Sequence, residues 1–452
     1  MPRNAQGKSV TTLPSLPEVH SSVAIPEAGS AWRKMVGFAG PAMLVCVGYM
    51  DPGNWATDIE GGARFGYQLI WVLLLSNMMA VVLQTLAARL GLVTGRDLAQ
   101  ACRDFYSRRV ALTLWVLCEV AIMACDLAEV LGSAIAMNLL FGIPLIVGVL
   151  ITAFDVLLLL VLQNFGIRKV EAVILSLVGT IGFCYVVEIA VAHPDWGGIG
   201  RALIRPTLSG ESLYVAIGII GATVMPHNLY LHSALVQTRR VIRSAGGIRQ
   251  AIRYNLLDTI ISLNLAFFVN AAILVMSAAV FFRNGRVVTE LGQAYETLTP
   301  LLQTTVGHTL ATAMASTLFG VALLCSGQSS TITGTMAGQI VMEGFVQLRL
   351  PPWLRRLITR LLAILPAVAF IAWKGNTGSY QLLILSQVVL SLQLPFAIVP
   401  LIQFTSNRKL MGEFVSGPGL RLLAWICAII IISLNLWLLG RTALGLVRGG
   451  AE

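Results

Sequence analysis

Residues 48–62, GYMDPGNWATDIEGG, place an acid, a proline and a glycine inside an apolar stretch long enough to cross a membrane. A carboxylate at bilayer depth costs about 2.5–3.5 kcal/mol, so Asp51 is expected to have a functional partner. Pro52 and Gly53 interrupt the helix and free backbone carbonyls, which then need partners of their own. A bound cation or a water-filled cavity would satisfy both the carboxylate and the carbonyls.

A second break occurs in residues 222–236, ATVMPHNLYLHSALV. Aligning Pro226 with Pro52 places Met225 against Asp51, so both stretches break at the same step. Two broken helices, each opening a set of five spans, are the pattern of an inverted-repeat transporter. In such a transporter the substrate site lies near the middle of the membrane, where the two breaks meet.

The groups at the two breaks indicate which substrate the site would suit. Asp51 offers a carboxylate, Asn54 an amide oxygen and Met225 a thioether, and Gly48 and Ala222 could contribute freed carbonyls. A thioether is a soft ligand that adds little for Mg²⁺ or Ca²⁺ and suits transition metals. The set favours Mn²⁺, Fe²⁺ or a similar ion, although a methionine taken alone is more often ordinary core packing.

Three acids form a stripe in the third apolar stretch, LCEVAIMACDLAEVLG. Glu119, Asp126 and Glu129 are spaced by seven and three residues, so on a helix they fall within an arc of about 80°. Such acids are too costly to face lipid and must face protein, water or a cation. They could carry protons together with His227, two residues beyond Met225, unless that histidine is simply packed in its helix.

The composition identifies the elements that must hold these groups. The 452 residues are 56% hydrophobic and only 12% charged, with a mean hydropathy of +0.80, whereas a soluble domain has about 25% charged residues. Apolar runs of about 20 residues, the length a helix needs to cross the hydrocarbon core, recur along the chain. We therefore predict an all-α integral membrane protein with eleven transmembrane helices.

The predicted spans cover residues 36–60, 67–88, 110–140, 144–162, 173–192, 213–236, 256–282, 307–345, 355–373, 380–404 and 422–442. The eighth is expected either as one long tilted helix or as a span that ends near Cys325 and continues as a polar extension. The domain organisation follows from the breaks and the spans. It comprises a tail over 1–34, a first five-helix repeat over 35–192, a second over 210–404 and the eleventh helix over 420–445.

Basic residues in the connections predict the orientation, because they favour the cytoplasmic side. Placing the N-terminus inside puts most of the 31 Lys and Arg residues on that side, and eleven spans then leave the C-terminus outside. Residues 1–34 contain four prolines and no apolar core. They are expected to form a mobile cytoplasmic tail and not a signal peptide.

Several function classes are excluded by what the sequence lacks. The net charge of +10 is explained by the basic connections, so no nucleic-acid partner is needed. The seven cysteines contain no CxxC pair, which favours buried thiols over disulfides or a zinc site. No GxxxxGK[ST] motif is present and the connections are too short for an ATPase domain, so neither a nucleotide nor a cofactor is expected.

The motifs DPGN at 51–54, MPH at 225–227 and GQSSTITGTMAGQ at 327–339 resemble the natural-resistance-associated macrophage protein (Nramp) family. Members are proton-coupled importers of divalent transition metals with a LeuT-type fold. The resemblance covers the chain from about residue 35 to the last predicted span. It implies a 5+5 inverted repeat with broken helices 1 and 6. It also implies alternating access without enzymatic activity, as in a bacterial inner-membrane manganese importer that also carries Fe²⁺, Cd²⁺ and Co²⁺.

The resemblance also implies the residues of the metal site. These are the side chains of Asp51, Asn54, Met225 and Gln387 and the carbonyls of Gly48 and Ala222. The two carbonyls join at different stages of transport, and most members carry alanine where this chain has Gly48. Gln387, in the LSQVVLS run, approaches the ion during occlusion.

A proton route separate from the metal's path is implied as well. The resemblance assigns Asp126 and Glu129 to it, with a basic residue of the ninth span as partner. Arg355 and Arg356, in PPWLRRLITR, are the matching positions. We predict that Asp51 is both metal ligand and first proton acceptor. The alternative is that Asp126 and Arg356 form a structural ion pair between two helices.

Three other functions remain open from the residues. A carrier of amino acids or other organic solutes would present unwound backbone to a carboxylate, which Asp51 would repel. A metal-dependent membrane enzyme would need a pair such as HExxH, whereas His227 and His232 are five residues apart. A passive metal channel would conduct without saturation and would not require two matching repeats.

Overall fold

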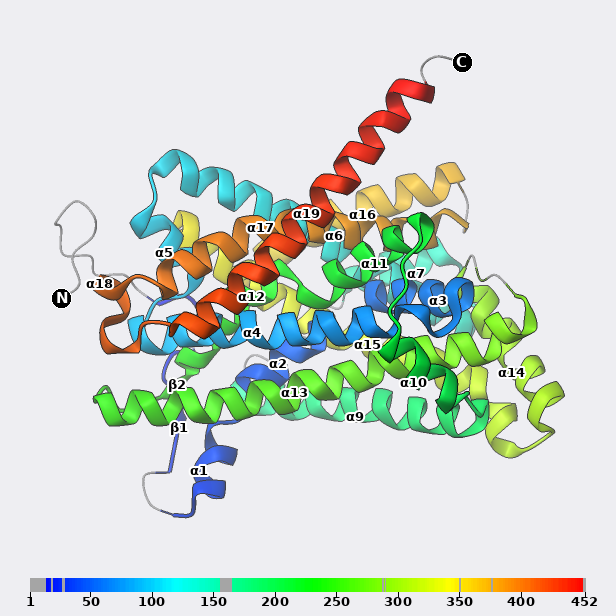
Figure 1. The fold of residues 1–452 in the computed structure, drawn as a ribbon, viewed down its shortest axis with the longest axis horizontal. Helices are drawn as coiled ribbons and strands as arrows, with labels where there is room; N and C mark the ends of the chain where they lie inside the picture. The colour runs from blue at the N-terminus through cyan, green and yellow to red at the C-terminus, as the bar shows by residue number, and fades with distance from the viewer. Residues whose placement is uncertain are drawn as a thin grey trace.

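The protein is a bundle of long helices, most of which run along its longest axis (Figure 1). The computed structural model describes residues 14–17, 19–26, 29–154, 165–286, 288, 290–348, 351–374 and 377–449. Two short strands, β1 (Val23–Ala24) and β2 (Arg239–Arg240), pair in parallel toward one end of the bundle. We call this end, which also holds α5 and α18, the N-terminal face.

The first half of the chain contains α1 (Ala31–Phe38), α2 (Pro41–Gly48), α3 (Pro52–Phe65), α4 (Ile70–Thr94), α5 (Leu98–Phe105), α6 (Arg108–Phe141), α7 (Leu145–Ile151), α9 (Ile167–Ala192) and α10 (Trp196–Ile204). The second half contains α11 (Gly210–Val224), α12 (Pro226–Leu235), α13 (Ala245–Val280), α14 (Leu291–Val306), α15 (Leu310–Val346), α16 (Pro352–Lys374), α17 (Thr377–Thr405), α18 (Arg408–Met411) and α19 (Pro418–Gly449). The 3₁₀ turns are η1 (Gly66–Leu69), η2 (Thr152–Phe154), η3 (Val236–Thr238), η4 (Phe282–Asn284) and η5 (Gly412–Phe414).

Both predicted helix breaks are present. The first separates α2 from α3, and the second separates α11 from α12. Pro52 and Pro226 each occupy the first position of the helix that follows, where the missing N–H would have no helical partner anyway. Asp51 caps α3 by accepting the backbone N–H of Asn54 at 2.8 Å. The two prolines therefore start new helices instead of kinking continuous ones.

The predicted all-α membrane architecture is confirmed. Seven helical stretches of the described residues are apolar and long enough to cross a bilayer by length and composition. The number of eleven spans stays a prediction, because residues 155–164 of the fourth lie outside the described residues. The sequence did not predict α14, a helix in the connection after the seventh predicted span.

The eighth predicted span is one continuous helix, α15. Its glycines lie against α6: a Cβ added to Gly327 would fall 2.2 Å from the Ser133 Oγ, and one added to Gly334 would fall 2.8 Å from the Glu129 Oε1. Small residues let membrane helices approach closely. The polar stretch at 327–339 therefore belongs to a continuous, closely packed helix, while the point at which this helix leaves the membrane stays a prediction.

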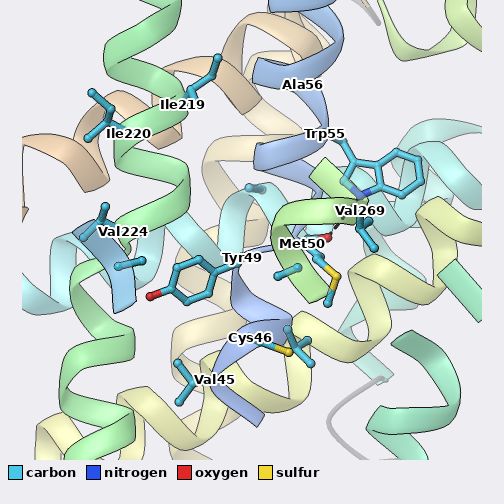
Figure 2. Packing of buried hydrophobic residues seen from close by; sticks show 14 of the residues in the cluster. Val45, Cys46, Tyr49, Met50, Trp55, Ala56, Ile219, Ile220, Val224 and Val269 are labelled. Carbon is cyan, nitrogen blue, oxygen red and sulfur yellow. Dashed lines mark hydrogen bonds between the residues drawn. The ribbon is translucent and has the colours of Figure 1, made fainter. Parts of the chain in front are cut away.

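Apolar side chains surround both breaks (Figure 2). Figure 2 shows Val45, Tyr49 and Met50 beside the first break, with Val224 beside the second. Just beyond the first break, the Trp55 ring packs edge-on against Tyr185 and Phe319, with ring centroids 5.1 and 5.4 Å apart. The polar groups at the breaks therefore lie in a buried and tightly packed interior.

Candidate metal centre

Three oxygen atoms converge on the side-chain amide nitrogen of Asn54. The Asp51 Oδ1 lies 2.8 Å from this nitrogen, the Ala222 carbonyl oxygen 3.1 Å and the Gly48 carbonyl oxygen 3.4 Å. Asp51 is fully buried, and Asn54 is 1% exposed. Oxygens from both breaks thus point at one place inside the protein, where a positively polarised group now sits and where a cation could bind.

The other carbonyls freed at the first break already have donors. Asn270 of α13 donates its amide to the Tyr49 carbonyl at 2.7 Å. The Met50 carbonyl accepts the Ser326 hydroxyl at 2.5 Å and the Trp55 indole N–H at 3.2 Å. These bonds fix the unwound backbone from three helices. The Gly48 carbonyl is not used in these bonds and faces the Asn54 amide nitrogen.

Among the buried oxygens near the breaks that lack a hydrogen-bond partner within the described residues are the Asp51 Oδ2 and the Gln387 Oε1. Buried polar atoms are almost always paired, so each exception needs a reason. Gln387 of α17 lies directly on the first break, since a Cβ added to Gly53 would fall 1.7 Å from its Nε2. A bound cation would satisfy both oxygens.

Met225 occupies the second break itself, with φ 14° and ψ 114° between α11 and α12. Its side chain is fully buried and packs with Ala121, Cys125 and Leu390. Its sulfur also lies 3.7 Å from the Asn228 amide nitrogen. The residue thus has the packing contacts of a core methionine together with one polar neighbour at the break.

A line of polar groups leads away from the second break toward α16. The His227 Nε2 lies 3.8 Å from the Cys125 Sγ, which lies 3.7 Å from the Glu129 Oε1. The Glu129 Oε2 in turn lies 3.7 Å from an Arg360 guanidinium nitrogen. All four side chains are buried. Of the residues expected on the proton route, His227 and Glu129 are therefore brought together.

The other residues expected on the proton route are Asp126, Glu119, Arg355 and Arg356, and they differ in burial and in their contacts. Asp126 is buried, and its backbone carbonyl lies 3.5 Å from Arg360. Glu119 is only partly buried and accepts the Trp115 indole N–H at 3.0 Å. The side chains of Arg355 and Arg356 lie outside the described residues, so their expected pairing is not described.

Sequence analysis missed Arg360 as the partner of Glu129. The signal was present, because Arg360 lies four residues after Arg356 and hence on the same helix face. Its guanidinium also donates to the Thr331 hydroxyl of α15 at 2.6 Å. Arg360 therefore joins α16 to both α6 and α15 at the buried acid.

A second polar chain connects the helices around the first break. Gln84 of α4 donates to the Tyr49 hydroxyl at 2.8 Å, and its Oε1 lies 3.0 Å from the His232 Nδ1. The other ring nitrogen of His232 lies 3.2 Å from the Asn255 Oδ1. The chain therefore links the end of α2 with α4, α12 and α13.

The start of α2 is anchored on the N-terminal face. Asp258 of α13 accepts the backbone N–H groups of Gly40 and Ala42 at 3.2 and 3.0 Å. Arg239, whose side chain is fully buried, bonds the Ala39 carbonyl at 2.6 Å and the Glu171 carboxylate at 2.8 Å. This half of the broken span is therefore held by charged side chains from other elements.

Buried oxygens at two facing helix breaks, inside a bundle of membrane-spanning helices, define a multi-pass membrane protein with a polar centre at its core. Comparison with known proteins shows to which family of membrane proteins the chain belongs. A family model described as natural resistance-associated macrophage protein-like matches residues 42–441. The chain belongs to this family, so the resemblance seen in the motifs is confirmed.

Similar proteins carry consistent names. A divalent metal cation transporter MntH of Nostoc sp. is 58% identical over 430 residues, which cover 94% of this chain and 96% of the relative. A protein of the same name from Bradyrhizobium diazoefficiens is 55% identical over 440 residues, 96% of each chain. The crystal structure of the Eremococcus coleocola manganese transporter superposes with a TM-score of 0.86 at 42% identity, over 94% of this chain and 90% of that one.

The fold is shared more widely. Mhp1, described as a nucleobase-cation-symport-1 family transporter, has a TM-score of 0.55 at 16% identity, over 88% of this chain and 92% of its own. A likeness at this identity concerns the fold alone. It agrees with the expected LeuT-type arrangement with broken helices.

Proposed function

We propose that the protein imports divalent transition metal ions, Mn²⁺ foremost, with Fe²⁺, Cd²⁺ and Co²⁺ as further substrates. The observation that carries the proposal is the convergence of Asp51, Gly48 and Ala222 oxygens on one buried point between the breaks. The names of the relatives support it, since they are divalent metal cation transporters and a manganese transporter. The metal is cargo, so no resident cofactor is required.

In this proposal the ligands are Asp51, Asn54, Met225, Gln387 and the carbonyls of Gly48 and Ala222. Asn54 turns its amide so that the oxygen faces the ion, because the nitrogen that now meets three acceptors would repel it. The carboxylate supplies the single charge, and the remaining donors are neutral. Such a site binds modestly, as a carrier must in order to release its cargo.

The sulfur of Met225 gives the site its preference for transition metals over Ca²⁺ and Mg²⁺. The methionine lies at the second break, three residues after Ala222, whose carbonyl is another proposed ligand. Its apolar neighbours Ala121, Cys125 and Leu390 exclude water from one side of the sulfur. Its packing contacts therefore hold the thioether in position and do not argue against ligation.

Protons move with the metal but along a separate route, the line of polar groups from His227 to Arg360. Asp51 accepts a proton as the metal leaves, and His227 and Glu129 continue the route toward Arg360, with Asp126 alongside. Glu119 precedes Asp126 by seven residues on α6 and lies nearer the cytoplasmic end of the proton route. Arg355 and Arg356 lie on the same helix as Arg360. The Glu129–Arg360 contact also serves as a structural link between helices, since a buried pair can do both.

The N-terminal face is the cytoplasmic face of a bacterial inner membrane, and the C-terminus lies outside. Residues 35–192 and 210–404 form the two inverted repeats. Transport proceeds by alternating access, in which α2 and α12 move away from α4 and α13 to open the N-terminal face. The Tyr49–Gln84–His232 chain breaks in that step.

Rival functions account for the centre less well. Among the described residues, no group of three or more His, Cys, Asp or Glu side chains could hold a metal ion, which disfavours a metal-dependent hydrolase. A carrier of carboxylate solutes would have to place its substrate against buried Asp51. A passive channel is distinguished by flux that does not saturate.

The test is Mn²⁺ uptake into proteoliposomes of wild type and Asp51→Asn in the presence of excess Ca²⁺, with internal pH recorded. We expect saturable uptake with proton entry for wild type and neither for the variant. The matched control is Asn264→Ala, because the Asn264 amide bonds Asn77 and Ile260 instead of either break. Uptake by Asp51→Asn equal to that of wild type would overturn the proposal.

A further inference from the structure

Asn228 occupies the same place in the second break that Asn54 occupies in the first. Each is the third residue of the helix that starts with a proline, α12 and α3 respectively. Asn54 reaches across to the second break, where its amide meets the Ala222 carbonyl at 3.1 Å. Asn228 reaches across in return, with its amide nitrogen 3.5 Å from the Val45 carbonyl of α2. Asn54 and Asn228 thus hold equivalent positions in the first and the second break.

The Asn228 amide lies directly against Gly48. A Cβ added to Gly48 would fall 2.4 Å from the Asn228 Nδ2 and 3.1 Å from its Oδ1. The glycine therefore gives this amide room beside a carbonyl of the proposed metal site. An alanine methyl at position 48 would push the amide aside.

The Asn228 amide oxygen has no role in holding the fold. The side chain is fully buried, and its Oδ1 lacks a hydrogen-bond partner within the described residues. Its nitrogen meets two weak acceptors, the Val45 carbonyl and the Met225 sulfur at 3.7 Å. An amide rotates end for end at little cost. A buried amide oxygen beside a thioether and a freed carbonyl is a ready neutral ligand for a cation.

We propose that Asn228 is a further ligand of the transported metal, and that Gly48 is the residue that admits it. The inference rests on the proposed function of the site. It pairs one amide oxygen from each break, Asn54 and Asn228, around the charge of Asp51. An added neutral oxygen hardens the ligand set without adding charge, which favours Mn²⁺ over the softer Cd²⁺.

The experiment measures Mn²⁺ and Cd²⁺ affinity of the purified full-length protein by calorimetry. The variants are Asn228→Ala, Gly48→Ala and the double variant, with Asn264→Ala as the matched control. We expect Asn228→Ala to weaken Mn²⁺ binding about tenfold and Cd²⁺ binding clearly less, because Cd²⁺ relies more on the sulfur. Gly48→Ala should weaken Mn²⁺ binding to a similar degree. The double variant should bind no more weakly than either single variant, because both changes remove the same ligand, the Asn228 amide oxygen.

Wild-type Mn²⁺ affinity in Asn228→Ala, with binding lost in Asp51→Asn, would overturn this inference and leave the proposed function intact. Additive losses in the double variant would also count against it, because they would mean that Gly48 and Asn228 act separately. Unchanged binding in Asp51→Asn would instead overturn the proposed function. Thermal unfolding without metal reports whether each variant is folded, so a loss of affinity in a protein with an unchanged midpoint is a loss of ligation.

Discussion

The Asn54 side chain joins the two helix breaks directly, because its amide nitrogen lies 3.1 Å from the Ala222 carbonyl oxygen. One residue at the start of α3 thus contacts the last turn of α11, across 168 positions of sequence. A metal bound between them would contact the same two groups. If the proposed metal binds there, its binding is coupled to the relative position of the two breaks, as the proposed alternating access requires.

The first prediction concerns the Met225 thioether. Met225→Ala should keep Mn²⁺ uptake but lose most of the preference for Mn²⁺ and Cd²⁺ over Ca²⁺, because only oxygen donors remain. Uptake of each ion into proteoliposomes, in competition with Ca²⁺, measures this preference. The control is Leu390→Ala, which removes an apolar neighbour of the sulfur but no donor. Unchanged selectivity in Met225→Ala would mean that the sulfur only packs.

The second prediction concerns Gly53 and Gln387. Gly53→Ala places a methyl group where the Gln387 amide now lies, and overpacking of this kind costs about 1–3 kcal/mol. We expect a lower unfolding midpoint and slower uptake. Gln387→Ala in the same protein should restore the midpoint but not the uptake, because the clash is gone and so is the ligand. Full recovery of uptake would show that Gln387 is not needed for transport.

The third prediction separates proton movement from metal movement. Glu129→Gln removes the acid that bridges Cys125 and Arg360 while leaving the metal ligands in place. Mn²⁺ binding should stay within a few-fold of wild type, whereas Mn²⁺-driven proton entry should fall by at least tenfold. A pH-sensitive dye inside the vesicles records the protons. Glu413→Gln is the comparison, since this acid is exposed and pairs with Arg249, away from the line from His227 to Arg360. Equal proton entry in Glu129→Gln and wild type would place the route elsewhere.

The sequence predicted the features of the centre that depend on local chemistry. Asp51 followed by proline and glycine cannot continue a helix, and the matching proline at 226 revealed the second break. Arg360, Asn270 and Gln84 were missed because their roles arise from contacts between distant helices. Nothing local marks Asn270 as the residue that holds the Tyr49 carbonyl. Small residues in α15 were seen as a motif, but their close approach to α6 depends on the packed bundle.

The N-terminal segment also makes contacts that the sequence did not predict. A polar, proline-containing stretch was expected to be mobile, yet its described residues contact the N-terminal face. The Ser15 hydroxyl donates to Asp97 at 2.7 Å, and the Ser21 backbone N–H donates to the Gln237 carbonyl at 2.9 Å. Leu16 is only 3% exposed. A few buried contacts spread along a polar segment leave no periodic pattern that sequence analysis could find.

The last prediction concerns the pH dependence of this contact. Partial burial lowers the pKa of His20 below its usual value of 6.5, and the nearby charge of Arg243 lowers it further. The docked segment thus favours the neutral imidazole. When the pH falls below about 6.5, the undocked segment takes up a proton first, so docking weakens as the pH falls. The protection of the Ser21 amide against hydrogen exchange, measured relative to the intrinsic exchange rate, should therefore fall several-fold more in wild type than in His20→Gln between pH 7.5 and pH 5.5.

The comparison of the two proteins isolates His20 from the other groups that titrate in this range. Burial raises the pKa of the Asp97 carboxyl to about 6, but that group is present in both proteins, and the protection is calculated against the intrinsic exchange rate of each sequence at each pH. Their difference therefore reports the imidazole alone. Identical pH profiles would mean that protonated His20 is tolerated beside Arg243, and that the segment stays docked at acidic pH.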